Sequence, residues 1–222
     1  MTVRLVLVCT ANICRSPLAA AILDAEVRDR GVASLVAVDS AGVHASHGNE
    51  AAEPSAAIAG DLGLDLAAHR SRPVDDELDD ERTVLLTMTE QHRHLLVTLE
   101  PAVASRCFTL REFARLVAAI DLVGLPDAAD ERVLEVVRRA DARRATVGRA
   151  AAGRAPSRRG STRRAFPWRA GAWGATSTSG GPEDIADPYG RSDAHYRVMA
   201  AIVRELIGEV APVLLGAPEG EV

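Results

Sequence analysis

Lysine is absent from this chain, so arginine supplies all 26 basic side chains, a bias that carries little information about function. Cysteine occurs only three times, an odd number that argues against a disulfide-stapled extracellular domain. No apolar run approaches the ~18 residues that a membrane-spanning helix needs, and the opening residues are not typical of a secretory leader. We therefore expect a reduced, cytoplasmic chain without a membrane span.

Aromatic residues are also rare, at 3% of the 222 residues, whereas hydrophobic residues make up 47%. A core of useful size must therefore be built mainly from alanine, valine and leucine. The length suits one domain that carries a large insertion, or one domain with a small appendage. A net charge of −5 hides a strong asymmetry, because 11 arginines and a single acid lie between Arg138 and Arg169, against 15 arginines and 30 acids elsewhere.

Short apolar runs alternate with helix-forming segments along the chain. Strands are predicted over 4–8, 35–40, 82–88 and 106–109, and helices over 18–30, 50–62, 90–99, 110–119, 130–142 and 193–214. Such alternation is typical of a parallel sheet covered by helices on both faces. We predict a three-layer α/β fold with a central four-stranded parallel sheet.

The stretch from about 143 to 182 breaks this alternation. It is rich in Arg, Gly, Ser and Ala and shows no sustained period, which predicts a disordered insertion within a single domain over 1–222. Trp168 and Trp173 lie there among arginines, a pattern that can bind single-stranded nucleic acid or an acidic surface. A solvated linker is the interpretation that we favour, and nucleic acid is the alternative partner.

The stretch VLVCTANICRSPLAAA, residues 6–21, joins a strand to a helix through a tight loop. Pro17 is expected at the first helical position. Loop amides and the positive end of the helix dipole then form an anion site. They and Arg15 would stabilise the thiolate of Cys9, and the Arg15 guanidinium can hold two phosphate oxygens. This arrangement predicts in-line attack by Cys9 on a bound tetrahedral oxyanion.

The loop from Cys9 to Pro17 resembles the signature of the low-molecular-weight protein tyrosine phosphatases. The resemblance continues through the segments 39–42 (DSAG), 69–72 (HRSR) and 187–189 (DPY), and covers about 3–125 and 183–212. It implies a phosphatase that hydrolyses phosphotyrosine, in a protein or a small aryl phosphate, through a phosphocysteine intermediate. It implies no metal and no other cofactor.

The resemblance also implies a role for each residue of the loop. Cys9 would be the nucleophile, and Ser16 would hydrogen-bond its sulfur. Asn12 would brace the loop in a left-handed conformation through a hydrogen bond to Ser40. Arg15 would bind the phosphate together with the loop residues Thr10, Ala11, Asn12, Ile13 and Cys14.

Asp187, far along the chain, would protonate the leaving oxygen and then activate water. Pro188 would stiffen its loop, and Tyr189 would line the wall of the pocket. Cys14 would protect Cys9 by forming a reversible disulfide under oxidation, with simple loop packing as the alternative. Cys107 is expected to be inert core, His69 to be a surface or hydrogen-bonded structural residue, and His44, His47, His92 and His94 to bind no metal.

Two positions depart from the family pattern. Ala11 stands where the family usually has glycine, and a positive φ there would strain the loop by about 1 kcal/mol or more. The segment VHASHGN, residues 43–49, offers no aromatic residue for the second wall of the pocket, so Ser46 or His47 would take that place. We therefore expect weaker selectivity for aryl phosphates.

Three other functions stay open. A protein arginine phosphatase would, by the resemblance, have a small polar residue in place of Ile13, so Ile13 argues against this activity, whereas the missing aromatic wall keeps it open. An arsenate reductase of the same superfamily would need further cysteines, and Cys107 stands alone. A catalytically impaired module that binds phosphate or nucleic acid disagrees with the presence of Cys9, Arg15 and Asp187. The expected partner is a phosphotyrosine protein, with a bacterial tyrosine kinase as the candidate that the family suggests.

Overall fold

The computed structural model describes residues 2–75, 78, 80–152 and 181–217 of the chain. The elements follow in the order β1 (Val3–Cys9), α1 (Arg15–Asp29), β2 (Val36–Gly42), α2 (Glu53–Asp61), β3 (Thr83–Thr87), α3 (Glu90–Leu99), the 3-10 helix η2 (Pro101–Arg106), β4 (Cys107–Thr109), α4 (Leu110–Val117), α5 (Ala129–Ala152) and α6 (Asp193–Leu215). Among these residues no helix is long and apolar enough to cross a membrane.

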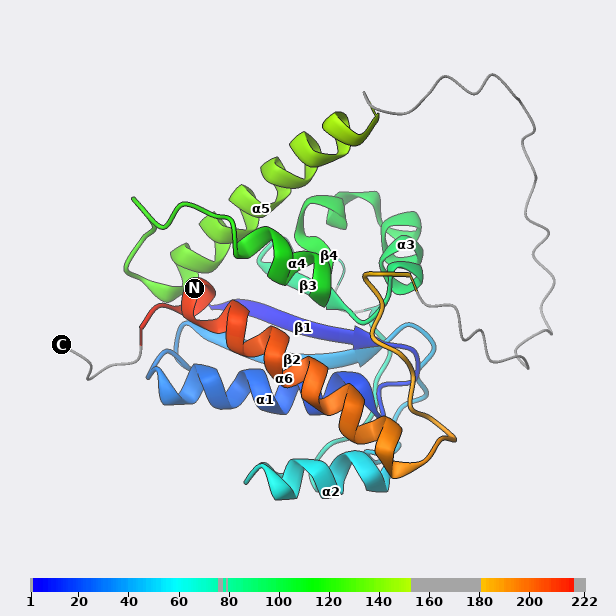
Figure 1. Ribbon diagram of the computed structural model, residues 1–222. Coiled ribbons are helices and arrows are strands. Elements are labelled where there is room, and N and C mark those ends of the chain that lie inside the picture. The colour runs from blue at the N-terminus through cyan, green and yellow to red at the C-terminus, as the bar shows by residue number, and fades with distance from the viewer. Residues whose placement is uncertain (1, 76–77, 79, 153–180, 218–222) are drawn as a thin grey trace, which may run out of the picture.

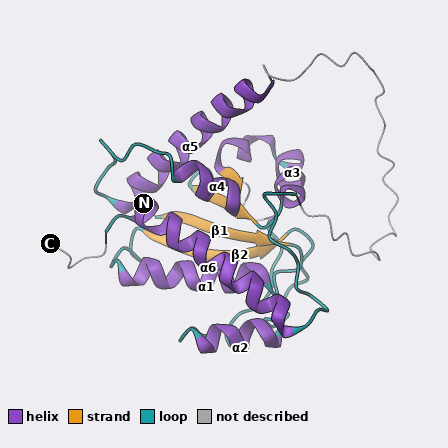
Figure 2. Ribbon diagram, in the orientation of Figure 1, coloured by secondary structure: helices purple, strands orange, loops and turns teal. Residues whose placement is uncertain are grey.

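The four strands form one parallel sheet in the order β2-β1-β3-β4, which confirms the predicted fold class. In the pairing of β1 with β2, Cys9 lies opposite Gly42. In the pairing of β1 with β3, Val8 lies opposite Thr87. The carboxyl ends of the three strands therefore coincide, and Figure 2 shows β1 and β2 pointing toward the side where loops gather.

Alternate residues of β1 point to opposite faces of the sheet, and both sets are buried. Leu5, Leu7 and Cys9 belong to the larger core, which they share with residues of α1, α4, α5 and α6. Val6 and Val8 belong to a smaller core under α3 and η2. Figure 1 shows α6 running beside α1, and both helices contribute residues to the larger core.

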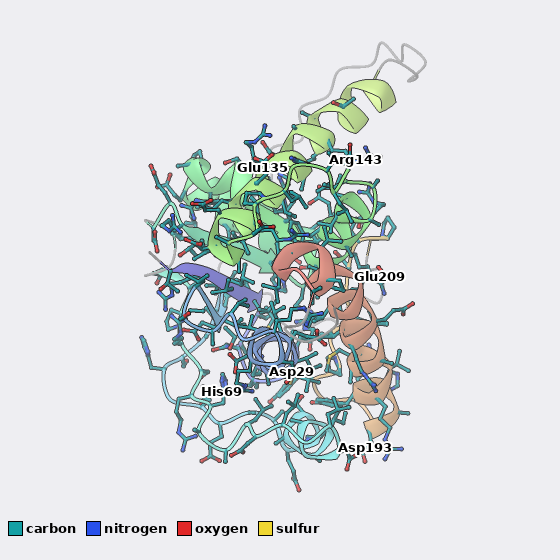
Figure 3. The ribbon with its side chains drawn as sticks, turned by 90° about the vertical axis from the view of Figure 1, so that its left-hand side faces the viewer. Asp29, His69, Glu135, Arg143, Asp193 and Glu209 are labelled. Carbon is teal, nitrogen blue, oxygen red and sulfur yellow. The ribbon has the colours of Figure 1, made fainter. Side chains whose placement is uncertain are left out.

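Helix α5 corrects the predicted start of the insertion. The sequence analysis ended this helix at residue 142 and assigned about 143–182 to a disordered segment, yet α5 continues to Ala152. Residues 153–180, with Trp168 and Trp173, lie outside the described residues, so the rest of that prediction stays a prediction. Figure 3 shows Glu135 and Arg143 along α5, on the opposite side of the molecule from His69.

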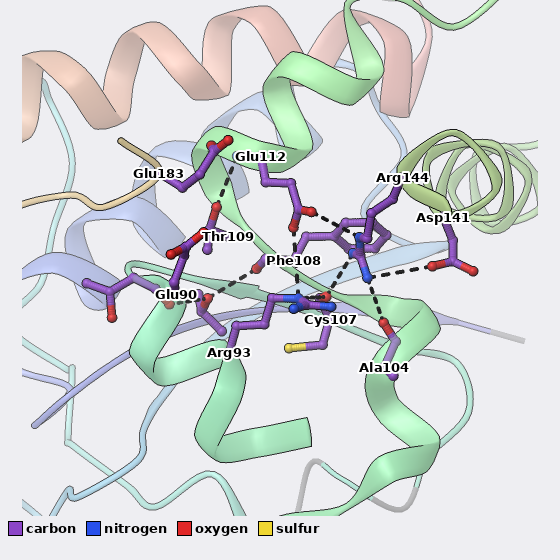
Figure 4. A network of polar contacts seen from close by, with 12 residues as sticks. Glu90, Arg93, Ala104, Cys107, Phe108, Thr109, Glu112, Asp141, Arg144 and Glu183 are labelled. Atoms are coloured by element: carbon purple, nitrogen blue, oxygen red, sulfur yellow. Dashed lines mark hydrogen bonds and ion pairs between the residues drawn. The ribbon is translucent and has the colours of Figure 1, made fainter. Parts of the chain in front are cut away.

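The extension of α5 is held by Arg144, whose side chain reaches three neighbouring elements. Its guanidinium lies 3.0 Å from a Glu112 carboxylate oxygen on α4 and 3.9 Å above the centre of the Phe108 ring. It also donates to the carbonyl oxygens of Ala104 at 2.9 Å and Cys107 at 3.0 Å. Figure 4 shows how these contacts converge. Tertiary contacts of this kind stabilise the extension of the helix beyond the predicted end at residue 142.

Candidate active site

The loop of residues 10–14 leaves β1 at Cys9 and enters α1 at Arg15. Cys9 is only 2% exposed and carries a free thiol. Helix α1 begins two residues before Pro17, a shift within the usual spread of helix boundaries. The first amide groups of any helix lack partners inside it, so the start of α1 presents donors and a positive dipole to the loop beside Cys9.

Ser16 lies next to the cysteine sulfur, as the sequence predicts. Its Oγ is 3.0 Å from Cys9 Sγ, accepts a hydrogen bond from Asn12 Nδ2 at 2.9 Å, and lies 3.3 Å from the carbonyl oxygen of Ala41. A hydroxyl group has a single hydrogen to donate. When Cys9 is a thiolate, that hydrogen goes to the sulfur, because a charged acceptor makes the stronger hydrogen bond.

Asn12 braces the whole loop. Its φ is 56°, which is the left-handed conformation that asparagine tolerates. The second hydrogen of its Nδ2 goes to Ser40 Oγ at 2.9 Å, and its Oδ1 accepts from the backbone amide of Arg72 at 3.0 Å. The predicted conformation and the predicted bond to Ser40 are both confirmed. His69 Nε2 lies 2.7 Å from the Asn12 carbonyl oxygen, so His69 is a hydrogen-bonded structural residue, as expected.

Ala11 does not carry the backbone strain that a positive φ would cause at this position. Among the described residues other than glycine, Asn12 alone has a positive φ. The condition for strain at Ala11 is therefore not met, and an alanine fits there without a conformational penalty. The left-handed turn of the loop falls one residue later, where an asparagine stands.

Gly42 provides the space in which the loop folds. A Cβ atom at this position would lie 2.6 Å from the carbonyl oxygen of Thr10 and 2.9 Å from the amide nitrogen of Asn12. Both are backbone atoms of the cysteine loop, so only glycine lets the end of β2 approach it this closely. The loop is also joined to this segment by hydrogen bonds from Val43 N to Cys9 O and from His44 N to Thr10 O, both 2.9 Å.

Arg15 and Asp187 meet, although 172 positions separate them in the chain. The Arg15 side chain is 4% exposed, and its Nη2 lies 2.6 Å from Asp187 Oδ2. The same Nη2 donates to Thr10 Oγ1 at 3.1 Å, and Nη1 donates to the carbonyl oxygen of Ile185 at 3.2 Å. Arg15 Nε is buried and has no hydrogen-bond partner among the described residues, which leaves a donor for an anion.

The segment before Asp187 is fixed to the start of α3. Asp184 Oδ1 accepts from the amide of Glu90, the first residue of α3, at 2.8 Å, and Asp184 Oδ2 accepts from the amide of Gly181 at 3.0 Å. The amide of Ile185 donates to the carbonyl oxygen of Met88 at 2.8 Å. These bonds satisfy a helix terminus and hold the segment that presents the Asp187 carboxylate, whose side chain is 46% exposed.

Tyr189 and the 43–49 segment flank the site. Tyr189 is 67% exposed, and its amide donates to Asp187 Oδ1 at 3.2 Å. Ser46 and His47 are both exposed, and the carbonyl oxygen of Ser46 accepts from the Ser71 hydroxyl. Ile13 is half-buried and packs against the larger core.

The two remaining cysteines are held as thiols. Burial raises the pKa of Cys14 to about 11, and its sulfur lies 3.6 Å from the Tyr196 hydroxyl of α6. Burial raises the pKa of Cys107 to about 12, in agreement with an inert core position. Both thiols are free in the structure, and the protective disulfide between Cys9 and Cys14 stays a prediction.

His92 is a residue near the site that the sequence analysis considered only as a metal ligand. Its Nε2 lies 2.9 Å from Thr10 Oγ1 in the cysteine loop. Among the described residues no group of three or more His, Cys, Asp or Glu side chains could hold a metal ion. The signal for His92 lay in the topology: β3 pairs with β1, so the first turn of α3 must start beside the loop that follows β1.

A parallel sheet that ends in a cysteine loop, with a buried arginine and an aspartate facing it, defines the class of cysteine-dependent phosphatases. Residues 4–140 match the family model described as low molecular weight phosphotyrosine protein phosphatase. The chain belongs to this family and is an enzyme of it. The match ends before residue 187, so the place of Asp187 beside Arg15 comes from the structure.

Individual relatives fall into two kinds. The chain is 38% identical to a protein-arginine-phosphatase from Geobacillus stearothermophilus over 113 residues, which are 51% of this chain and 72% of that protein. It is 36% identical to a low molecular weight protein-tyrosine-phosphatase from Streptomyces coelicolor over 130 residues, 57% and 78% of the two chains. The solved structure of the arginine phosphatase from Geobacillus stearothermophilus is 26% identical, with a TM-score of 0.56 and coverage of 94% and 90%.

Proposed function

We propose that the protein hydrolyses phosphotyrosine, in a protein or a small aryl phosphate, through a phosphocysteine intermediate. The observation that supports this most directly is the contact of Arg15 with Asp187 at 2.6 Å, beside the buried Cys9 thiol with Ser16 Oγ at 3.0 Å. The proposed nucleophile, the proposed anion-binding cation and the proposed proton donor therefore lie together at the carboxyl end of β1. A phosphotyrosine protein is the proposed partner, and a bacterial tyrosine kinase is the candidate that the family resemblance suggests.

In the first step the Cys9 thiolate attacks phosphorus and forms the P–S bond. The P–O bond to the phenolic oxygen breaks, and Asp187 in its acid form gives that oxygen a proton. Arg15 and the loop amides hold the equatorial oxygens and stabilise the charge that spreads over them. The Ser16 hydroxyl donates to the sulfur when it carries negative charge, before attack and again when the sulfur leaves.

In the second step a water molecule attacks phosphorus from the side that the phenol has left. Asp187, now a carboxylate, takes a proton from that water. The P–S bond breaks, and inorganic phosphate and the Cys9 thiolate are released. The Arg15 guanidinium can pair with the Asp187 carboxylate and can also bind a phosphate.

Two substitutions test this assignment with phosphotyrosine and para-nitrophenyl phosphate as substrates. Cys9→Ser should abolish turnover of both. Asp187→Asn should lower kcat on phosphotyrosine by about 10²–10⁴-fold, and by less on para-nitrophenyl phosphate, because para-nitrophenolate leaves readily without a proton. Asp29→Asn, at an exposed position of α1, is the matched control and should leave both rates unchanged. Equal losses of Asp187→Asn on the two substrates would remove Asp187 from the acid role.

Phosphoarginine is the second candidate substrate, because a relative that is 38% identical is a protein-arginine-phosphatase. The family resemblance places a small polar residue at position 13 in such enzymes, and this chain has Ile13. We expect Ile13→Thr to raise the ratio of kcat/KM for phosphoarginine over phosphotyrosine by about 10-fold. Ile58→Thr, a half-buried isoleucine of α2, controls for a general loss of packing and should leave the ratio unchanged.

A substrate panel separates the open readings. Release of inorganic phosphate is measured with phosphotyrosine, phosphoarginine, phosphoserine and a small alkyl phosphate, and arsenate reduction is measured alongside. The proposed function predicts the highest kcat/KM on phosphotyrosine, with only a modest preference over the alkyl phosphate, because the 43–49 segment has no aromatic residue. A dominant phosphoarginine activity of the wild-type enzyme would select the second candidate.

A further inference from the structure

His92 lies in the first turn of α3, away from the cysteine loop in sequence but in contact with it. Its side chain is buried, at 6% exposure. Thr89 caps the helix, and its hydroxyl accepts from the amide of His92 at 3.2 Å. The backbone of His92 is therefore fixed, and its ring carries Nε2 to within 2.9 Å of Thr10 Oγ1.

Thr10 Oγ1 is shared between His92 and Arg15. Arg15 Nη2 lies 3.1 Å from this oxygen, and because a guanidinium has no acceptor, the arginine must be the donor. With His92 as its other partner, the Thr10 hydroxyl has a fixed rotamer. Without His92 the hydroxyl could turn among its staggered positions and withdraw the acceptor that Arg15 uses.

The buried position of the His92 ring is energetically unfavourable for one of its two nitrogen atoms. Its Nδ1 is buried and has no hydrogen-bond partner among the described residues, and an unpaired buried polar atom is unfavourable. Burial, with smaller effects from Arg15 and His44, lowers the pKa of His92 to about 3. The ring is therefore neutral near pH 7 and adds no positive charge that would repel Arg15. The ring acts on the cysteine loop through Nε2, which contacts Thr10 Oγ1.

We propose that His92 is a positioning residue for phosphate binding, which through Thr10 Oγ1 holds the Arg15 guanidinium in the orientation that binds the phosphate. The inference rests on the proposed function, in which Arg15 binds the equatorial oxygens. Among the described residues, Arg15 has two other hydrogen-bond partners, Ile185 and Asp187, on the segment that leads to the proposed acid. Thr10 is its partner on the phosphate loop itself, so it stays in place when the Asp187 carboxylate turns to the leaving oxygen or to water.

The test compares two amides at position 92. A glutamine places its terminal amide near the position of Nε2, whereas an asparagine reaches only the position of Nδ1. The readout is the inhibition constant of inorganic phosphate against para-nitrophenyl phosphate, together with kcat and KM. We expect His92→Asn to raise the phosphate inhibition constant and KM by about 10-fold, which is the effect of one hydrogen bond to a charged group. His92→Gln should restore both to within about 3-fold of wild type on the same scale.

Two further variants make the test specific. In a Thr10→Val background the contacts of Thr10 Oγ1 with His92 and Arg15 are already lost. His92→Asn should therefore cause no further loss in that background. His94→Gln, on an exposed position of the same helix, should change nothing. Equal losses for Asn and Gln at position 92, or an undiminished loss in the Thr10→Val background, would overturn the positioning role while leaving the phosphatase intact. Failure of the proposed function would appear differently, as a wild-type enzyme that neither turns over the substrate nor is inhibited by phosphate.

Discussion

The cysteine loop can adopt its shape because Gly42 has no Cβ atom. A Cβ at this position would lie 2.6 Å and 2.9 Å from two backbone atoms of the loop. Gly42→Ala should therefore displace the loop, lower the free energy of unfolding by about 1–3 kcal/mol, and lower kcat/KM by at least about 10-fold, since small misplacements of catalytic groups are costly. Urea denaturation and steady-state kinetics measure the two effects.

Gly60→Ala is the matched control for that substitution. Gly60 lies in α2, and a Cβ there would meet nothing within 4 Å. Because alanine is the better helix former, this variant should be more stable by about 0.5–1 kcal/mol, with unchanged kcat/KM. A Gly42→Ala enzyme that behaves like the Gly60→Ala enzyme would show that the loop tolerates the side chain.

The contacts and conformations of individual residues differ in how well the sequence alone predicts them. The contact of Ser16 with Cys9 and the bond from Asn12 to Ser40 follow from a local motif and a family pattern, and both were predicted. Ala11, where a glycine is usual, was expected to strain the loop if its φ were positive, and conformation was needed to show that the left-handed turn falls on Asn12. His92 acts across two elements, so no spacing along the chain could reveal its contact.

Helix α5 shows the same limit for a longer segment. The residues after 142 were assigned to an insertion because Arg, Gly, Ser and Ala dominate the stretch as a whole. Alanine and arginine are also good helix formers, and a helix that has already started extends easily. Its continuation is then stabilised by the Arg144 contacts with Glu112, Phe108 and two backbone carbonyls, which no local pattern predicts.

Arg144→Met tests that anchor. The side chains of Arg144 and Glu112 are 19% and 15% exposed. Removal of the arginine leaves a mostly buried carboxylate, whose remaining ion-pair partner among the described residues is Arg93 at 3.9 Å. We expect a loss of about 2–4 kcal/mol in the free energy of unfolding, measured by urea denaturation. Arg143→Ala removes an exposed neighbouring arginine of the same helix and should change stability by less than about 0.5 kcal/mol. Similar values for the two variants would contradict an anchoring role.

The stability of the molecule as a whole should depend on pH through His92. Burial lowers its folded-state pKa to about 3 from the ordinary value of 6.5. Between these values the unfolded chain binds more protons than the folded one, so folding stability falls as the pH falls from 6.5 toward 3. The part of this trend that belongs to the histidine is isolated by comparing variants.

His92→Gln should flatten the pH dependence of the free energy of unfolding by up to about 1.4 kcal/mol per pH unit in this window. His94→Gln should keep the slope of the wild type, because His94 is exposed. Urea denaturation at several pH values between 4 and 7 provides the measurement. Parallel wild-type and His92→Gln curves would mean that His92 is protonated in the folded enzyme.

Two of the ion pairs of helix α4 join it to segments that lie further along the chain. Glu112 binds Arg144, and one turn later Arg115 binds Glu183 at 2.9 Å. The chain therefore departs from this helix before the insertion and returns to it just ahead of Asp187. With both junctions fixed, each doubling of the length between them costs only about 0.6 kcal/mol in closure entropy. We therefore expect a reporter or a binding peptide grafted between residues 153 and 180 to leave Asp187, the proposed acid, in its alignment.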